Sequence, residues 1–283
     1  MAEPVAAVVV NYNAAGHLQR CLSSLFAAGA GEVVVVDNAS VDGSEAQVAG
    51  TGARWLPAGT NLGYGRAANR GVAATTASQV LVCNPDIEVD PAALRALAAA
   101  LERDPNLGVV GPRLVDPDGS LYPSARTFPD LLDAIGHGLL GTVAPHNRFT
   151  RRYRMLDWDH RQRARVDWVS GACFLARRQA WESLGGFDPS YFMYLEDVDL
   201  CWRLGRAGWA VGYEPGARVL HVQGVSAARH PYRMLAEHHR SMWLYAWRTT
   251  AGARRAALPV VAAGLAGRLA VKAAEHRLGS SRP

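Results

Sequence analysis

Three short runs of apolar, β-forming residues each end in a cluster of polar side chains. The runs are Val8 to Val10, Val33 to Val36 and Val80 to Val82, and the clusters begin at Asn11, Asp37 and Asn84. Continuous apolar runs of this length indicate strands buried on both faces of a parallel sheet. The carboxyl ends of such strands meet at one edge, where open α/β sheets bind ligands. The chain is therefore expected to gather these polar clusters in one binding site.

Strand and helix patterns alternate over the first hundred residues. We expect strands near residues 5–11, 32–36 and 79–83, and helices near 16–28 and 64–74. This alternation is typical of βαβ units. Gly63 and Gly65 resemble part of a dinucleotide fingerprint, but a genuine fingerprint turns directly from the first strand into the first helix. A dehydrogenase is therefore not favoured.

The remainder of the body carries weaker patterns. Asp90 followed by Pro91 predicts the N-cap and first turn of a helix that runs to about Arg103. Residues 141–165 show no regular period, so we expect a mobile surface loop there. The other expected elements are a turn at 116–119, a strand through 169–175, a short helix around Trp181, a helix over 196–206 and two short strands at 209–213 and 219–221.

Length and composition predict one large α/β domain over residues 1–226 and a basic helical region over 227–283 of the 283-residue chain. The second region carries ten basic and two acidic residues, with Trp243 and Trp247 one helical turn apart. Such a tail suits an anionic membrane surface or a polyprenyl diphosphate, and packing on the body is an equal alternative. No nucleic-acid-binding module accompanies the charge, so a nucleic-acid partner is not expected.

Three features of the chain indicate its compartment. No segment approaches the roughly 18 consecutive apolar residues that a membrane span needs, and the N-terminal residues lack the basic start of a signal peptide. The four cysteines (Cys21, Cys83, Cys173 and Cys201) are widely spaced, which favours reduced, buried thiols over zinc or disulfides. We therefore expect a cytoplasmic protein, peripheral to the inner face of the plasma membrane.

Six short motifs carry a family resemblance. They are Val9 to Asn13, Val36 to Ser40, Asn61-Leu62-Gly63 with Ala67 and Asn69, Asn84-Pro85-Asp86, Gly185-Gly186-Phe187-Asp188 and Glu196-Asp197-Val198-Asp199. In this order the chain resembles the inverting family 2 glycosyltransferases. Residues 122–126 and 191–200 are similar to the rhamnosyltransferase branch. The resemblance covers roughly residues 5–226 and implies a GT-A fold, which is a Rossmann-like, mostly parallel sheet flanked by helices.

A nucleotide needs an aromatic face for its base and an acceptor for the imide N–H of that base. Tyr12 and Asp37, at the ends of adjacent strands, would supply both. Tyr12 could instead simply pack. The resemblance adds a set of further nucleotide-binding residues: Asn13, Asn61, Gly63, Asn69 and Asn84.

A departing nucleoside diphosphate carries growing negative charge, which a divalent cation usually stabilises. Asp86 is the best candidate ligand, and the resemblance implies His221 as a second one. His221 could also be a satisfied histidine at a strand end. The family's Asp-x-Asp is here Asn84-Pro85-Asp86, so one carboxylate is replaced by an amide. Oxygen ligands with one imidazole favour Mg²⁺ or Mn²⁺.

Inversion by single displacement needs one base for the acceptor hydroxyl. The resemblance indicates Asp197 as this base and Glu196 as a residue that orients the acceptor, both at a helix start whose dipole favours the ionised form. Caps without catalytic function are the alternative. Asp199 and Arg203 are expected to form a structural i, i+4 pair. Arg126 and the residues 238–240 could contact sugar or lipid diphosphate, or be ordinary surface groups.

The resemblance implies transfer of L-rhamnose from dTDP-L-rhamnose to the N-acetylglucosamine of a polyprenyl-diphosphate-linked acceptor in cell-wall polysaccharide assembly. Two alternatives stay open. One is another hexosyltransferase of O-antigen or exopolysaccharide synthesis. The other is a non-catalytic protein that binds a nucleotide-sugar, although Asp86 and Asp197 are both present. The oligomeric state is not predicted.

Overall fold

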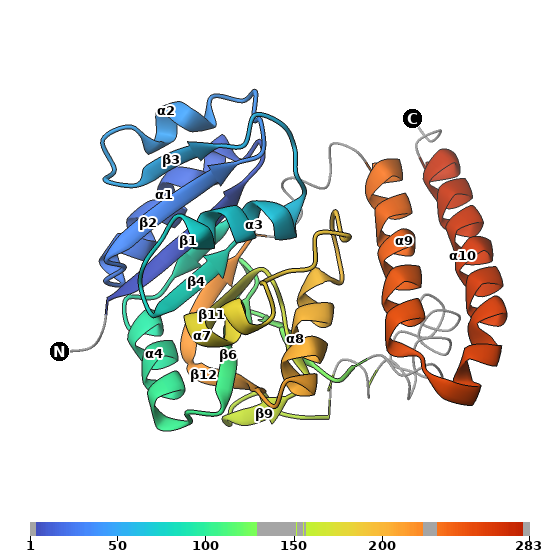
Figure 1. Cartoon of the computed structure of the whole chain (residues 1–283). Helices are drawn as coiled ribbons and strands as arrows, with labels where there is room; N and C mark the ends of the chain where they lie inside the picture. The colour runs from blue at the N-terminus through green and yellow to red at the C-terminus, as the bar shows by residue number, and fades with distance from the viewer. Residues whose placement is uncertain (1–3, 129–150, 152–154, 156, 223–230, 280–283) are drawn as a thin grey trace.

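The computed structural model describes residues 4–128, 151, 155, 157–222 and 231–279 (Figure 1). A ten-stranded sheet forms the centre, in the order β3-β2-β1-β4-β11-β6-β12-β5, with β7 beside β6 and β9 beside β12. The strands of this sheet are β1 (Val5–Asn11), β2 (Glu32–Asp37), β3 (Arg54–Pro57), β4 (Gln79–Cys83), β5 (Ile87–Val89), β6 (Leu107–Val115), β7 (Leu121–Tyr122), β9 (Ala164–Val166), β11 (Cys173–Arg177) and β12 (Ala210–His221). A separate pair consists of β8 (Ala125–Arg126) and β10 (Trp168–Val169).

Helices cover both faces of the sheet. The helices are α1 (Ala15–Ala27), α2 (Ser44–Val48), α3 (Tyr64–Ala73), α4 (Ala93–Arg103), α7 (Arg178–Ser183), α8 (Glu196–Arg206), α9 (Pro231–Thr249) and α10 (Leu258–Gly279), with a 3₁₀ helix at Gly252–Ala257. One core layer packs α1, α2 and α4 against the sheet, and the other packs α3, α7 and α8 against the opposite face. Buried valines alternate between these two layers along β1 and β2, which explains the continuous apolar runs.

The N-terminal half confirms the predicted βαβ arrangement. β1 pairs in parallel with β2 and β4, and β2 pairs in parallel with β3. Asn11 lies beside Asp37 in register, so these two polar strand ends are neighbours. Beyond β4 the sheet is mixed, because β11 runs antiparallel to both β4 and β6.

Three local predictions need correction. Ala92 is the N-cap of α4 and makes no capping hydrogen bond, whereas the Asp90 carboxylate lies 3.5 Å from Arg218. The expected strand through 169–175 is divided into β10 and β11 by a turn. The two expected strands at 209–213 and 219–221 are one long strand, β12, because an irregularity between Glu214 and Arg218 lets pairing with β6 continue.

Part of the expected loop lies outside the described residues. This applies to residues 141–150, 152–154 and 156, whereas Ala164 and Arg165 belong to β9. The predicted boundary between residues 226 and 227 also lies outside them. The four cysteines are free and buried, as predicted.

The C-terminal helices α9 and α10 run side by side as a hairpin next to α8 (Figure 1). α9 contacts the body through Tyr245, which is buried in the core layer of α3, α7 and α8. Most side chains of α10 are exposed or half-buried up to Lys272, including Val260 and Val271. Within the described residues, no helix combines the length and apolarity needed to cross a bilayer.

Candidate active site

A cavity of about 460 Å³ opens where β1 and β4 end. Its lining includes eight of the residues expected from the sequence: Tyr12, Asn61, Gly63, Asn84, Asp86, Glu196, Asp197 and His221. They come from the residue after β1, from the segment before α3, from the segment after β4, from the first turn of α8 and from the end of β12. Segments far apart in the chain therefore meet at one edge of the sheet.

Asp37 and Asn13 lie behind the cavity wall and brace the strand ends. Asp37 Oδ1 accepts a hydrogen bond from Asn11 Nδ2 at 2.8 Å, and its Oδ2 accepts one from the Ser40 backbone N–H at 2.9 Å. Asn13 Oδ1 accepts from the Val41 N–H at 2.9 Å. These bonds hold the two strand-end loops against each other.

Asn38 is a cavity residue that the sequence reasoning left out of the site, although it belongs to one of the motifs. Its side chain accepts a hydrogen bond from the Leu62 N–H at 3.1 Å and donates one to the Gly63 carbonyl at 3.2 Å. It is buried. Asn38 thus fixes the segment that carries Asn61 and Gly63.

Gly63 has a positive φ of 84°, and a β-carbon there would overlap the carbonyl oxygen of Phe192. The next residue, Tyr64, donates its backbone N–H to that same oxygen at 3.0 Å, and its hydroxyl bonds to the Gly171 carbonyl. Glycine at this position therefore permits a close contact between the start of α3 and the loop that precedes α8.

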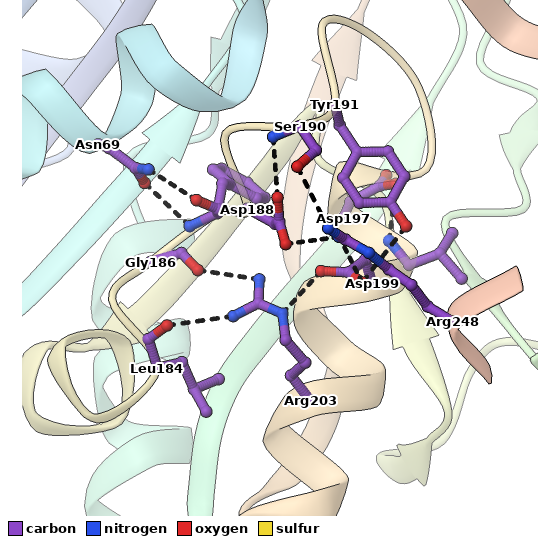
Figure 2. A network of polar contacts seen from close by, with 12 residues as sticks. Asn69, Leu184, Gly186, Asp188, Ser190, Tyr191, Asp197, Asp199, Arg203 and Arg248 are labelled. Atoms are coloured by element: carbon purple, nitrogen blue, oxygen red, sulfur yellow. Dashed lines mark hydrogen bonds and ion pairs between the residues drawn. The ribbon is translucent and has the colours of Figure 1, made fainter. Parts of the chain in front are cut away.

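Asn69 lies outside the cavity and supports a neighbouring loop. Its side chain donates to the Phe187 carbonyl at 2.8 Å and accepts from the Phe187 N–H at 2.9 Å. Figure 2 shows this pair of bonds at the edge of the network that surrounds α8. The motif Gly185 to Asp188 is thereby fastened to α3.

The two carboxyl groups that begin α8 have different surroundings. Asp197 accepts hydrogen bonds from the backbone N–H groups of Gly171 and Val198, both at 2.8 Å. Glu196 Oε2 is buried and accepts no hydrogen bond from the described residues. Burial raises the pKa of Asp197, and burial together with the negative charge of Asp197 raises the pKa of Glu196 to about 8. At Glu196, burial therefore outweighs the expected effect of the helix dipole.

The backbone immediately before these carboxyl groups is unusual. Tyr194 and Leu195 have positive φ angles of 68° and 60°. Non-glycine residues rarely adopt this region, because each instance costs about 1–3 kcal/mol and persists only where the surrounding structure enforces it. The loop is held by packing and hydrogen bonds on both sides, and it aims both carboxyl groups into the cavity.

An ion-pair network fixes α8 (Figure 2). Asp199, which is buried, accepts from Arg203 Nε at 2.6 Å, which confirms the predicted i, i+4 pair. Arg203 also donates to the carbonyls of Gly186 and Leu184. Arg248 of α9 reaches the same cluster by binding Asp188.

Asp86 and His221 lie together on one wall of the cavity. His221 Nε2 is 3.4 Å from Asp86 Oδ1 and 3.3 Å from Asn84 Nδ2. Asp86 Oδ1 is buried and accepts no hydrogen bond from the described residues. A buried carboxylate oxygen beside an imidazole suits Mg²⁺ or Mn²⁺, and Mg²⁺ is commonly held by one or two carboxylates plus substrate phosphates. Among the described residues, no group of three or more His, Cys, Asp or Glu side chains could hold a metal ion.

Several cavity residues were not anticipated, or were left open. Arg126 and His238, for which contact with sugar or diphosphate was an open alternative, do line the cavity. Trp168 and Arg233 also line it, and neither belongs to a recognisable motif. His239 points elsewhere and lines a groove between α9 and α10.

Two proteins of Mycobacterium tuberculosis are similar to the chain in sequence. It is 42% identical over 260 residues to the N-acetylglucosaminyl-diphospho-decaprenol L-rhamnosyltransferase of Mycobacterium tuberculosis, an alignment that covers 87% of this chain and 84% of the relative. It is 31% identical over 218 residues to the pre-mycofactocin glycosyltransferase of the same species, which covers 76% of this chain and 41% of the relative.

Solved structures share the fold. The mannosyltransferase PcManGT from Pyrobaculum calidifontis, in complex with GDP-Man and Mn²⁺, superposes with a TM-score of 0.60 over 97% of this chain and 76% of the other, at 18% identity. GalNAc-T7 with UDP, GalNAc and Mn²⁺ gives 0.57 over 78% of this chain and 44% of the other, at 15% identity. The sheet and its flanking helices thus form a GT-A fold, as predicted. Residues 6–199 match the model of glycosyl transferase family 2, and the chain belongs to this family.

Proposed function

We propose that the protein transfers L-rhamnose from dTDP-L-rhamnose, with inversion, to the N-acetylglucosamine of a polyprenyl-diphosphate-linked acceptor. Membership of a transferase family sets aside the alternative of a non-catalytic binding protein. The observation that carries the proposal is one cavity with Tyr12, Asn61 and Asn84 on the strand-end side and Asp197 at the head of α8. The similarity to an L-rhamnosyltransferase supports the sugar and the acceptor.

In this proposal Asp197 is the general base. Its carboxylate is oriented by the N–H groups of Gly171 and Val198, so it can take the proton of the acceptor hydroxyl as that oxygen attacks the anomeric carbon. The nucleoside diphosphate leaves from the opposite face, which gives inversion. Glu196, whose pKa is about 8, is mostly protonated at neutral pH and can donate a hydrogen bond to the acceptor sugar.

The nucleotide lies on the strand-end side of the cavity. Tyr12 stacks on the base, and Asp37 with Asn13 supports that wall from behind. Asn61, Gly63 and Asn84 contact the nucleotide, while Asn69 keeps the adjacent loop in place. Asp86 and His221 would hold a divalent cation. Such a cation supplies positive charge for the diphosphate leaving group.

We further propose that the C-terminal hairpin attaches the protein to the cytoplasmic face of the plasma membrane. α10 exposes Val260 and Val271, and the basic residues Arg254, Arg255 and Arg268 lie in the same hairpin. Exposed apolar groups with nearby cations suit the boundary of an anionic bilayer. A lipid-linked acceptor resides in that bilayer.

A donor panel tests the proposed function. Purified enzyme, a short-chain prenyl-diphospho-N-acetylglucosamine acceptor and Mg²⁺ are incubated separately with dTDP-L-rhamnose, UDP-glucose or UDP-galactose, and products are identified by mass spectrometry. We expect a deoxyhexosyl product with dTDP-L-rhamnose and no product with either UDP-sugar. A hexosyl product from either UDP-sugar, without a rhamnosyl product, would favour the alternative of another hexosyltransferase.

A further inference from the structure

Helix α9 forms part of the active-site wall. Arg233, Met234 and His238, on one face of this helix, line the same cavity as Asp197. Ser241 Oγ donates to the Met193 carbonyl at 2.9 Å, which joins α9 to the loop before α8. The C-terminal region therefore contributes directly to the cavity as well as to the outer surface of the molecule.

Charged groups of both signs line the cavity. Three carboxyl groups line the cavity: Asp86, Glu196 and Asp197. In the described part of the chain, two arginines line it, Arg126 and Arg233. Glu196 is mostly protonated and adds little negative charge, and a diphosphate near the other two carboxylates is stabilised by a cationic partner.

Arg126 is held in a defined place beside Asp197. Its guanidinium lies 5.6 Å from the ring centre of Tyr122 and 5.1 Å from that of Trp168. It donates hydrogen bonds to the Pro123 carbonyl at 2.8 Å and to the Tyr122 hydroxyl at 3.2 Å. Part of its donor capacity is therefore used within the protein.

Arg233 has a different environment. Its guanidinium lies 4.7 Å from the ring centre of Phe192, and the side chain is exposed. Stacking on an aromatic face orients a guanidinium while its edge can still donate to phosphate oxygens. Nearby His238 is largely neutral, because burial lowers its pKa to about 4. The cation that α9 presents to the cavity is thus Arg233.

We propose that Arg233 is the binding residue for the diphosphate of the lipid-linked acceptor. This inference rests on the proposed function, in which the acceptor hydroxyl approaches Asp197. The diphosphate of such an acceptor is joined to the same sugar ring, so it must lie within one ring's length of the reacting oxygen. Arg233 and Asp197 line one cavity together with Phe192, Met193 and Tyr194. In the proposed function the donor diphosphate lies beside Asp86 and His221, which line the same cavity.

The test compares two acceptors that differ in charge. Calorimetry measures the affinity of dTDP-loaded enzyme for a short-chain prenyl-diphospho-N-acetylglucosamine and for the neutral octyl N-acetylglucosaminide. We expect Arg233→Gln to weaken binding of the charged acceptor by about tenfold to a hundredfold, the range for a lost hydrogen bond to a charged group. Binding of the neutral acceptor and of dTDP should stay as in the wild type, and Arg233→Lys should recover part of the loss.

Arg95→Gln is the matched control, because Arg95 is an exposed arginine on α4, away from the cavity. It should bind both acceptors like the wild type. Equal weakening of both acceptors by Arg233→Gln would mean that Arg233 only positions Phe192, and the subsite would be rejected. Unchanged binding of the charged acceptor, in an enzyme that glycosylates it, would also reject the subsite and leave the proposed function intact. A wild-type enzyme that never glycosylates the charged acceptor would overturn both the subsite and the proposed function.

Discussion

Glu196 is buried and the adjacent Asp197 is half-buried, and the hydrogen bonds of these two acidic residues separate their roles. Two backbone N–H groups stabilise the charged form of Asp197, whereas Glu196 Oε2 accepts no hydrogen bond from the described residues. Asp197 is therefore the first of the pair to ionise as pH rises. This difference leaves Asp197 as a base and Glu196 as a protonated neighbour at the start of one helix.

Asp197→Asn should abolish transfer while leaving nucleotide binding nearly unchanged. An amide cannot accept the acceptor proton, and loss of a general base typically costs about 10²- to 10⁴-fold in rate. Turnover and calorimetric dTDP affinity check this prediction. Wild-type turnover, or a loss of dTDP affinity as large as the loss of rate, would contradict the assignment of Asp197 as base.

Glu196→Gln should change how stability depends on pH. The pKa of Glu196 is higher in the folded state, about 8, than in an unfolded chain. Its stabilising contribution is therefore complete below the unfolded pKa near 4.5 and is lost as pH rises through about 8. The glutamine does not titrate. The Tm of the variant relative to the wild type should thus rise between pH 5 and pH 9, and a constant difference would argue against a protonated Glu196.

Asp86→Ala should weaken metal-dependent nucleotide binding, and His221→Ala should do so less severely. Asp86 is the carboxylate that lies beside His221 and Asn84 on the cavity wall. Calorimetry of dTDP with Mg²⁺, and again with EDTA, measures both effects. If EDTA changes neither binding nor turnover in the wild type, arginine side chains rather than a metal ion neutralise the diphosphate.

At the scale of elements, the start of α8 is held in place from α9. Arg248 binds Asp188, lies 3.2 Å from Ser190 Oγ and stacks 5.5 Å from the ring centre of Tyr191 (Figure 2). These contacts fasten the loop that leads to Tyr194 and Leu195, whose left-handed backbone needs such support.

Arg248→Met should therefore loosen this loop. We expect a loss of about 1–3 kcal/mol in the free energy of unfolding, because carboxylates lose a charged donor. The turnover number should fall more than the donor KM rises. Arg254→Met is the control, since Arg254 is exposed in the 3₁₀ helix. Denaturant unfolding and steady-state kinetics provide the measurements. If both variants have the same free energy of unfolding and the same turnover number, Arg248 does not stabilise this loop.

At the scale of the whole molecule, the two C-terminal helices have different tasks. α9 lines the cavity, whereas most described side chains of α10 are exposed or half-buried. A truncation before α9 should therefore remove activity on every acceptor. A truncation after α9 should spare the chemistry.

Deletion of residues 251–283 should reduce co-sedimentation with anionic liposomes. Each basic group near such a surface contributes about 1 kcal/mol, so several must act together. Activity should fall on long polyprenyl acceptors in liposomes but not on a short soluble acceptor. High salt should mimic the deletion, because exposed charges are screened within about 8 Å at physiological ionic strength. Equal liposome binding by both forms would assign α10 a purely structural role.

Local sequence patterns were sufficient for the parallel half of the sheet and for the polar edge of the cavity. The apolar runs of β1 and β4 are buried on both faces, as in a parallel sheet, and the parallel pairing of these strands brings Tyr12 and the Asn84 cluster to the same edge. The Asp199–Arg203 pair was predictable for a similar reason, since residues four apart share a helix face. In each case the geometry of a single element, or of strands in a parallel sheet, determines the outcome.

Tertiary structure alone decided the rest. Asn69 and Asp37 belong to family motifs, but their side chains bind other parts of the protein. Asn69 is hydrogen-bonded to Phe187, and Asp37 is hydrogen-bonded to Asn11 and Ser40. Arg233 enters the active site because α9 folds back on the loop before α8, a contact between distant residues that no local period encodes. The ionisation of Glu196 likewise depends on burial by segments distant in sequence. Desolvation belongs to the assembled fold, and a sequence pattern does not reveal it.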